Sequence, residues 1–473
     1  MSELAYRSGA GRWVIAITVL GSALGFLDAT VVNVALPAIG ADLGAGSAGL
    51  QGVLTGYLLT LSSFILIGGA YADRFGRRRV FMIGTGWFTL ASIACALAPT
   101  VPILIAARLL QGVGAALVTP GSLAIIEATF RPSDRSRAIG AWAGLSAVGA
   151  AAGPLLGGLL VDAGSWRAVF ALNVPIGVAV LLVAVRHVPE SRDPDAAPGL
   201  DIPGALLAVV GLGGLTYVLI DPGHGAAWRG AAVGVGALGA LAAFVVRELR
   251  TPGPMVPMSL FAVRRFTAAN LVTFAVYGAL GGVMFLLVVY VQVVLGESAL
   301  VAGAATLPIT LAVLVLSPVM GATVERWGPR PPLVAGPSLI AAGALLLSRL
   351  GPGSSVPAAV LPGVLVLGIG LGVTVAPVTS TALSSVPERH SGVASGINNA
   401  TARLATLLVV AGLPGAAGLS GRGLEDQTSL ARGFGAAMVM AAALAASGAA
   451  VAAATIGRGP LRPGALVAGV RPR

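Results

Sequence analysis

Two ionisable residues lie inside long apolar stretches of the sequence and are the first candidates for chemistry. Asp28 falls within the stretch 13–35, and Arg108 falls within the stretch 102–126. A charged group is costly inside a hydrocarbon layer, so each such residue indicates a functional site with a nearby partner. An opposite charge in contact keeps a carboxylate ionised, whereas burial without one favours its protonated form. The pair predicts a carboxylate that exchanges a proton; a static structural ion pair is the alternative.

Asp28 and Arg108 are expected at matching depth. At 1.5 Å per residue, positions about six residues from the end and the start of their stretches place both roughly 9 Å below the same surface. Gln111 and Gly112 follow Arg108 on the same helix face, where they add a polar ligand and close backbone approach.

A third ionisable residue, Arg403, lies in the apolar stretch 393–417, one helical turn after Asn399. No acid occurs at that depth in the same half of the chain. Arg403 is therefore expected to face a watery cavity, backbone carbonyls or an anionic part of a substrate, and a purely structural role remains open.

A strip of small residues marks the stretch 138–161, which reads Gly149-x-x-x-Gly153-Pro154-x-x-Gly157-Gly158. Glycines at this spacing share one helix face and let a neighbouring helix approach closely. Pro154 withholds one backbone donor and bends the helix. Such strips are common in membrane bundles, so packing alone is the alternative to a functional role.

The composition requires a membrane around these residues. Of 473 residues, 56% are hydrophobic and only 10% are charged, which excludes a water-soluble globular protein. Stretches of about 20 apolar residues, long enough to cross a bilayer, number fourteen. They run over 13–35, 50–71, 80–98, 102–126, 138–161, 168–186, 203–220, 230–246, 267–295, 300–323, 332–350, 356–383, 393–417 and 434–456. The expected fold class is an all-α polytopic membrane protein.

The basic residues indicate orientation rather than nucleic-acid binding. All 29 are arginine, and they cluster in alternate gaps between apolar stretches, as expected for cytoplasmic loops. The opposite gaps hold only Arg167, Arg229, Arg349, Arg422 and Arg432. Both termini are therefore expected in the cytoplasm. The single cysteine and the three separated histidines give no metal-ligand spacing, so we expect no metal and no cofactor.

An internal repeat divides the chain. Two gaps share a pattern of glycine, acid, arginine and glycine, namely Gly69-x-x-x-Asp73-Arg74-x-Gly76-Arg77-Arg78 and Gly321-x-x-x-Glu325-Arg326-x-Gly328-Pro329-Arg330. The acid in each copy is expected to latch two helices in one conformation. The repeat predicts a six-helix bundle over 1–190, two inserted helices over 191–262 and a second six-helix bundle over 263–473.

Together these motifs resemble the major facilitator superfamily, and specifically its fourteen-helix drug:proton antiporters. The segment Leu27–Pro37 is similar to the first-helix pattern Asp-x-Thr-x-x-Asn-x-Ala-Leu-Pro of that group. Residues 69–78 resemble the superfamily's gating motif, and Arg108-x-x-Gln111-Gly112 resembles the motif assigned to proton coupling. Residues 149–158 resemble the antiporter motif of exporters, while residues 166–177 and 391–400 are similar to further stretches typical of this branch.

The resemblance implies a major facilitator fold and proton-coupled efflux of hydrophobic or amphiphilic small molecules by alternating access. Residues 300–324 hold no acid, so neutral, monocationic or zwitterionic substrates are expected rather than dications. The partners would be the lipid bilayer, a small hydrophobic substrate and protons, acting on a monomer in the cell membrane. The candidate cavity residues are polar or aromatic side chains inside the spans: Asn33, Tyr57, Gln111, Trp142, Asn270, Tyr277, Tyr290, Gln292, Asn399 and Arg403.

Two other functions are alternatives. A facilitator or importer of a polar nutrient on the same fold is the closer alternative, and the glycine-proline strip with acid-poor spans favours export over it. A membrane enzyme or a signalling receptor is the more distant alternative, but the sequence offers it no cluster of His, Cys or carboxylates for catalysis and no soluble domain larger than about 20 residues.

Overall fold

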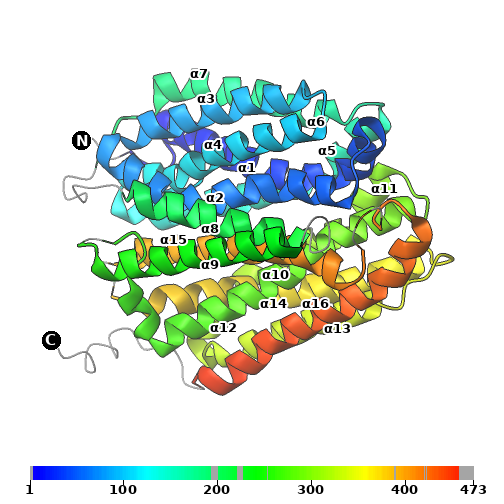
Figure 1. Cartoon of the computed structure of the whole chain (residues 1–473). Helices are drawn as coiled ribbons and strands as arrows, with labels where there is room; N and C mark the ends of the chain where they lie inside the picture. The colour runs from blue at the N-terminus through cyan, green and yellow to red at the C-terminus, as the bar shows by residue number, and fades with distance from the viewer. Residues whose placement is uncertain are drawn as a thin grey trace. The chain divides into compact units, whose positions relative to one another are not determined.

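The computed structural model describes residues 4–192, 201–220, 227–252, 254–387, 390–419, 421 and 423–457. The regular structure of these residues is helical, apart from one isolated β-bridge between Leu4 and Phe130 (Figure 1). Fourteen helical segments are long and apolar enough to cross a membrane. The predicted fold class and the predicted number of spans are therefore confirmed.

Up to Arg250, the described residues form nine helices. Their bounds are α1 Gly9–Leu43, α2 Ser47–Phe75, α3 Arg77–Ala96, α4 Val101–Thr129, α5 Pro132–Asp162, α6 Arg167–Ala171, α7 Asn173–His187, α8 Ile202–Ile220 and α9 Ala227–Arg250.

The described remainder adds seven α-helices, a 3-10 segment and a π-helical turn. Their bounds are η1 Met258–Ala262, α10 Arg264–Val293, α11 Ala299–Ala304, α12 Leu307–Trp327, α13 Arg330–Leu347, η2 Val356–Val360, α14 Leu361–Ser384, α15 Ser391–Ala416 and α16 Gln427–Thr455.

Three predicted spans are each built from two helical pieces. The span 168–186 breaks between α6 and α7, the span 300–323 breaks between α11 and α12, and the span 356–383 begins with η2. Pro175, Pro308 and Pro362 stand near the starts of the second pieces. Proline is tolerated in a first turn but removes a hydrogen bond further inside a helix, which explains the breaks.

The described residues fall into two compact units. The first comprises residues 1–255, 284–307 and 410–433, and the second comprises residues 256–283, 308–409 and 434–473. In the first unit α1 packs against α4, α5 and α7, while α4 also packs against α2 and α3. The α8–α9 hairpin contacts α2. In the second unit α13 and α14 pack along each other.

Large apolar side chains remain exposed on the outer faces of these helices. Leu90, Leu97, Leu182 and Val235 are each at least 67% exposed. In water such surfaces would aggregate, whereas lipid accepts them, so these faces are those of a membrane protein.

Candidate functional site

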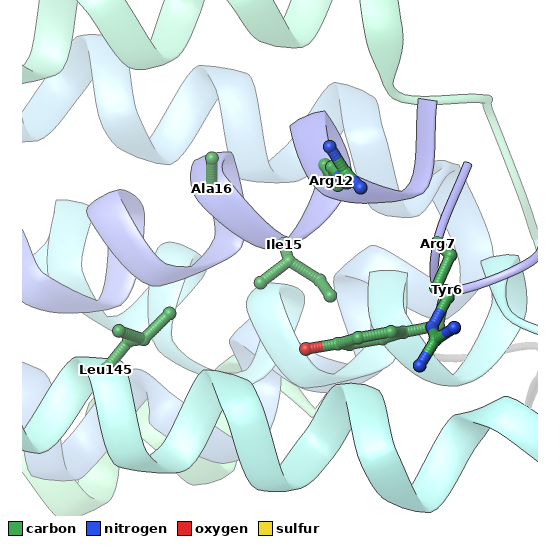
Figure 2. A pocket seen from close by; sticks show the side chains of 6 residues that line it. All are labelled: Tyr6, Arg7, Arg12, Ile15, Ala16 and Leu145. Carbon is green, nitrogen blue, oxygen red and sulfur yellow. The ribbon is translucent and has the colours of Figure 1, made fainter. Parts of the chain in front are cut away.

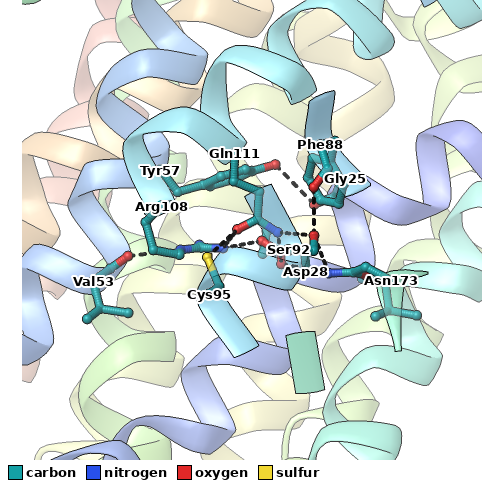
Figure 3. A network of polar contacts seen from close by, with 12 residues as sticks. Gly25, Asp28, Val53, Tyr57, Phe88, Ser92, Cys95, Arg108, Gln111 and Asn173 are labelled. Atoms are coloured by element: carbon teal, nitrogen blue, oxygen red, sulfur yellow. Dashed lines mark hydrogen bonds and ion pairs between the residues drawn. The ribbon is translucent and has the colours of Figure 1, made fainter. Parts of the chain in front are cut away.

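The buried ion pair expected from the sequence is present in the first unit. Asp28 lies in α1 and Arg108 in α4, and Arg108 Nη1 donates to Asp28 Oδ2 at 2.5 Å (Figure 3). The two side chains are 0% and 1% exposed, respectively. Because neither charge reaches solvent, each depends on the other for stabilisation in the ionised form.

Arg108 is held from several directions. Its Nε donates to the carbonyl oxygen of Val53 at 3.1 Å, and its Nη1 also donates to Gln111 Oε1 at 2.6 Å. The guanidinium lies 4.4 Å from the centroid of the Tyr57 ring and 5.7 Å from that of Phe170. These contacts fix the cation in place, and the aromatic rings compensate part of its lost hydration.

The second oxygen of Asp28 faces two amides. Asp28 Oδ1 accepts from Gln111 Nε2 at 2.8 Å and from Asn173 Nδ2 at 3.1 Å. Both amides also donate to Ser92 Oγ, at 2.8 and 3.4 Å. The thiol of Cys95 donates to Gln111 Oε1 at 3.6 Å. Every group that contacts the carboxylate is a donor, which is the arrangement that an ionised carboxylate requires.

Small residues bring the helices of this site together. A Cβ added to Gly112 would lie 2.3 Å from the carbonyl oxygen of Tyr57, so α4 touches α2 through backbone atoms. Thr60 Oγ1 donates to the carbonyl oxygen of Leu109 at 2.7 Å across the same contact. A Cβ on Gly114 would lie 2.7 Å from the backbone nitrogen of Phe88 in α3. Gly112 and Gly114 thus let α4 approach α2 and α3 closely, which brings Arg108 to its partners.

The glycine strip of α5 contacts two different elements. A Cβ on Gly153 would lie 2.0 Å from Thr30 Oγ1, and one on Gly157 would lie 3.1 Å from the carbonyl oxygen of Val31. Thr30 and Val31 follow Asp28 closely in α1, so this face of α5 supports the helix that carries the carboxylate. A Cβ on Gly149 would meet the Ala23 side chain at 3.0 Å on the same helix.

The other side of the α5 strip packs against α11. A Cβ on Gly158 would lie 2.4 Å from Leu300 Cα, and one on Gly303 would lie 2.2 Å from the carbonyl oxygen of Pro154. At the end of α5, Asp162 accepts from the backbone nitrogens of Ala299 and Leu300 at 3.1 and 3.0 Å. The sequence did not single out Asp162, whose role depends on a contact across 137 positions.

The arginine-rich segment between α2 and α3 is fixed by two acids. Asp73 pairs with Arg77 at 2.8 Å. Glu190, which follows α7, accepts from the backbone nitrogens of Arg78 and Arg79 at 3.1 and 3.2 Å. A carboxylate at the N-terminus of α3 is favourable because unpaired amides and the helix dipole point toward it. Sequence reasoning missed Glu190, although an acid in a gap on the same side as the arginines was the available signal.

Both copies of the repeat place a glycine with positive φ between two helices. Gly76 has φ 111° between α2 and α3, and Gly328 has φ 78° between α12 and α13. Arg326 lies exposed in the last turn of α12, while the Glu325 side chain lies outside the described part of the structure. A side chain at either φ would strain the backbone, which explains glycine at the same place in each copy.

The candidate cavity residues of the first unit have varied surroundings. Tyr57 and Gln111 belong to the network around Asp28. Trp142 Nε1 donates to Ser22 Oγ at 3.0 Å, and Gln292 Nε2 donates to the carbonyl oxygen of Val34 at 3.1 Å. Asn33 donates within its own helix to Ala29, and Tyr290 is buried.

In the second unit the buried polar contact involves Asn398. Its Nδ2 donates to Thr273 Oγ1 at 2.8 Å and to Asn270 Oδ1 at 3.3 Å. Asn399, the candidate next to it, is exposed, and Tyr277 and Arg403 are partly exposed. The two amides are adjacent in sequence and therefore point to different faces of α15, of which only that of Asn398 is buried.

A cavity of about 490 Å³ lies in the first unit between the beginning of α1 and α5 (Figure 2). None of the candidate cavity residues lines it. Its lining consists of Tyr6, Arg7, Arg12, Ile15, Ala16 and Leu145.

Comparison with known proteins gives the family. The profile of the Major Facilitator Superfamily matches residues 18–410. The chain is 38% identical to the Multidrug resistance protein Stp of Mycobacterium tuberculosis (strain CDC 1551 / Oshkosh), over 81% of this chain and 72% of that protein. It is 36% identical to the Methylenomycin A resistance protein of Bacillus subtilis (strain 168), over 85% and 87%. It is 35% identical to the Tetracenomycin C resistance and export protein of Streptomyces glaucescens, over 78% and 69%.

Solved structures with low sequence identity share the fold. A D-xylose-proton symporter aligns with a TM-score of 0.66 at 17% identity, covering 94% of this chain and 98% of the other. A POT family transporter in complex with 5-aminolevulinic acid aligns with a TM-score of 0.69 at 13% identity, covering 93% and 95%. The profile match, the relatives and the shared architecture lead to one conclusion. The chain belongs to the major facilitator superfamily of transporters, and its sequence relatives include resistance and export members.

Proposed function

We propose that the protein is a proton-coupled antiporter that exports hydrophobic or amphiphilic small molecules by alternating access. The observation that carries the coupling is the fully buried pair of Asp28 and Arg108. The relatives named for multidrug resistance, for methylenomycin A resistance and for tetracenomycin C resistance and export support the direction of transport and the substrate class. A transporter role, rather than an enzymatic one, follows from the family.

In this proposal Asp28 is the proton-binding group. While ionised, it holds Arg108 from α4, Gln111 from α4 and Asn173 from α7. A proton on Asp28 removes the charge attraction and leaves the Arg108 cation buried with neutral partners. Breaking a buried ion pair costs on the order of 3–5 kcal/mol, so protonation favours a conformation in which Arg108 is differently solvated.

That energy is large enough to drive a conformational cycle. Each 1.4 kcal/mol changes an equilibrium about tenfold, so 3–5 kcal/mol can shift populations by roughly 100-fold to 4,000-fold. The proton on Asp28 would favour one conformation and the substrate the other, which the ionised carboxylate favours, so substrate binding releases the proton and links export to proton entry.

The remaining sequence expectations complete the proposal. Two six-helix bundles over 1–190 and 263–473, with the two inserted helices over 191–262 between them in sequence, would provide the alternating access. The segment 69–79 and its repeat at 321–330 would act as the cytoplasmic gate, and both termini would be cytoplasmic in a monomer.

Purified protein in proteoliposomes tests the coupling. With ethidium as the transported probe, Asp28→Asn is expected to abolish probe-driven proton movement and to leave the fold intact. The matched control is Asp42→Asn, on the same helix, because Asp42 pairs with Arg167 at 2.6 Å but is 47% exposed. Unchanged coupling in Asp28→Asn, with the control also unchanged, would refute the assignment. Efflux of sugars instead of amphiphiles would favour the nutrient alternative.

A further inference from the structure

Asn173 is buried beside Asp28, and within the described part of the chain only the NH₂ group of its side-chain amide makes hydrogen bonds. The side chain is 0% exposed, and its Nδ2 donates to Asp28 Oδ1 at 3.1 Å. Its Oδ1 is buried and has no hydrogen-bond partner among the described residues. An unsatisfied buried acceptor costs about 1–3 kcal/mol, so a position that keeps one calls for an explanation.

The two amides that face Asp28 differ in their freedom to turn. Gln111 Oε1 accepts from Arg108 Nη1 at 2.6 Å and from Cys95 Sγ at 3.6 Å, so reversing this amide would place its NH₂ group against a cation. The oxygen of Asn173 is bound by nothing described. Asn173 can therefore rotate about its terminal torsion, which is broad and roughly two-fold, at the cost of its Nδ2 contacts with Asp28 Oδ1 and Ser92 Oγ at 3.1 and 3.4 Å but without breaking a bond at its oxygen.

The position of the proton on Asp28 follows from its surroundings. Oδ2 faces the Arg108 cation, which repels an added proton, so the proton binds Oδ1. Oδ1 meets only NH₂ donors while the carboxylate is ionised. A new O–H group on Oδ1 needs an acceptor, because a buried unpaired donor is as costly as an unpaired acceptor.

We infer that Asn173 serves both protonation states of Asp28 by reversing its side-chain amide. With Asp28 ionised, Nδ2 donates to Oδ1 of the carboxylate. When Asp28 takes a proton from water, an O–H bond forms on its Oδ1, and the Asn173 amide turns so that its own oxygen accepts that O–H group. Release of the proton to water restores the first arrangement. This inference rests on the proposed proton coupling and makes Asn173 a positioning residue for the proton.

Few other groups near Asp28 titrate or carry charge. Arg108 approaches from α4, the Tyr57 hydroxyl donates from α2 to the Gly25 carbonyl at 3.4 Å, and Cys95 lies on α3. The α6 helix contributes Phe170, and α7 contributes only the neutral Asn173. The α5 helix faces this part of α1 with its glycine strip. Asn173 is therefore assigned as the acceptor for the O–H group of protonated Asp28.

Infrared difference spectra of the purified protein between neutral and acidic pH test this directly. A carboxylic-acid carbonyl band that disappears in Asp28→Asn identifies protonated Asp28. The matched variants are Asn173→Thr, whose hydroxyl can both donate and accept, and Asn173→Val, its isostere without the hydroxyl. We expect the band to move to higher wavenumber in Asn173→Val, where the O–H group lacks an acceptor, and to stay near its wild-type position in Asn173→Thr.

The outcomes separate this inference from the proposed function. A band that depends on Asp28 but has the same position in Asn173→Val and in wild type would overturn the role of Asn173 alone. Absence of any Asp28-dependent band would overturn both. Asn173→Leu, which is closer to asparagine in volume, gives the same comparison if Asn173→Val does not fold. Proton release on addition of ethidium should likewise be lost in Asn173→Val and retained in Asn173→Thr.

Discussion

The carboxylate of Asp162 accepts a hydrogen bond from the backbone nitrogen of Leu300 at 3.0 Å, and so the last residue of α5 caps the first turn of α11. The glycine contact of Gly158 with Leu300 lies one turn earlier on α5. A charged cap and a backbone-to-backbone contact therefore hold the same two helices together.

Loss of this cap should loosen the contact. We expect Asp162→Ala to remove about 1 kcal/mol, as N-cap truncations typically do, and to raise labelling of a cysteine placed at the neighbouring Glu297 about fivefold. Asp162→Asn, whose amide oxygen still accepts one hydrogen bond, should lie between Asp162→Ala and wild type. Equal labelling in all three proteins would show that the cap does not hold α11.

The α5 helix should reject a methyl group within its glycine strip and tolerate one at a glycine outside the strip. Gly158→Ala would place Cβ 2.4 Å from Leu300 Cα, a backbone atom that cannot turn aside. We expect a loss of several degrees in Tm and of most probe efflux. Gly144→Ala is the control on the same helix, because no atom lies within 4 Å of its Cβ, and better helix propensity should leave it as stable as wild type or slightly more so.

A variant that removes the Arg108 cation should fold stably only when Asp28 is neutralised as well. Arg108→Gln leaves a buried carboxylate without its cation, at a cost of about 3–5 kcal/mol unless Asp28 takes up a proton. The double variant Asp28→Asn/Arg108→Gln should unfold at a higher temperature than Arg108→Gln. Arg108→Lys should retain only part of the stability. Its ammonium keeps the positive charge but cannot reach Asp28, Gln111 and the Val53 carbonyl together. Additive effects in this cycle would argue against the pair as a unit.

Glu190 should stabilise the start of α3. Its carboxylate accepts from the backbone nitrogens of Arg78 and Arg79, so Glu190→Ala is expected to cost about 1 kcal/mol and to weaken the response of Tm to salt. Glu297→Ala, at an exposed acid, is the comparison. The prediction fails if both variants melt alike.

The α8–α9 hairpin should lose stability in acid through Asp201. Burial of Asp201 opposes its ionisation, but hydrogen bonds from the Arg247 side chain and the Gly204 backbone outweigh it and lower the pKa of this carboxyl. A lowered pKa gives stability that is present above the ordinary Asp value and is lost as the pH falls through the folded value. Thermal unfolding between pH 7 and about 3 should show a steeper acid decline in wild type than in Asp201→Asn.

Much of the architecture follows from the sequence because bilayer thickness fixes the length of each span. The pair of Asp28 and Arg108 was predictable because two isolated charges at one depth have few other partners. The glycines Gly76 and Gly328 recur because both halves make the same turn.

The remaining features of the site depend on long-range contacts that no local sequence pattern indicates. Glu190 reaches α3 from more than a hundred residues away, and Asn173 contacts Asp28 across 145 positions. The choice between Asn398 and Asn399 requires the rotation of α15 about its axis, which a span boundary known to within a few residues cannot give.

In the proposed antiporter, a single proton-binding carboxylate would also limit the work that the protein can perform. Two carboxylates are buried in the described residues, and Glu248 lies near the end of α9, far along the chain from the network of Asp28. One proton per cycle delivers about 2.3 kcal/mol for each 100 mV of driving force. At 1.4 kcal/mol per tenfold ratio, one-for-one exchange of a neutral compound can sustain at most a roughly 40- to 50-fold concentration gradient per 100 mV. Resistance to a very potent toxin would therefore require a strongly energised membrane or a cell envelope that slows re-entry.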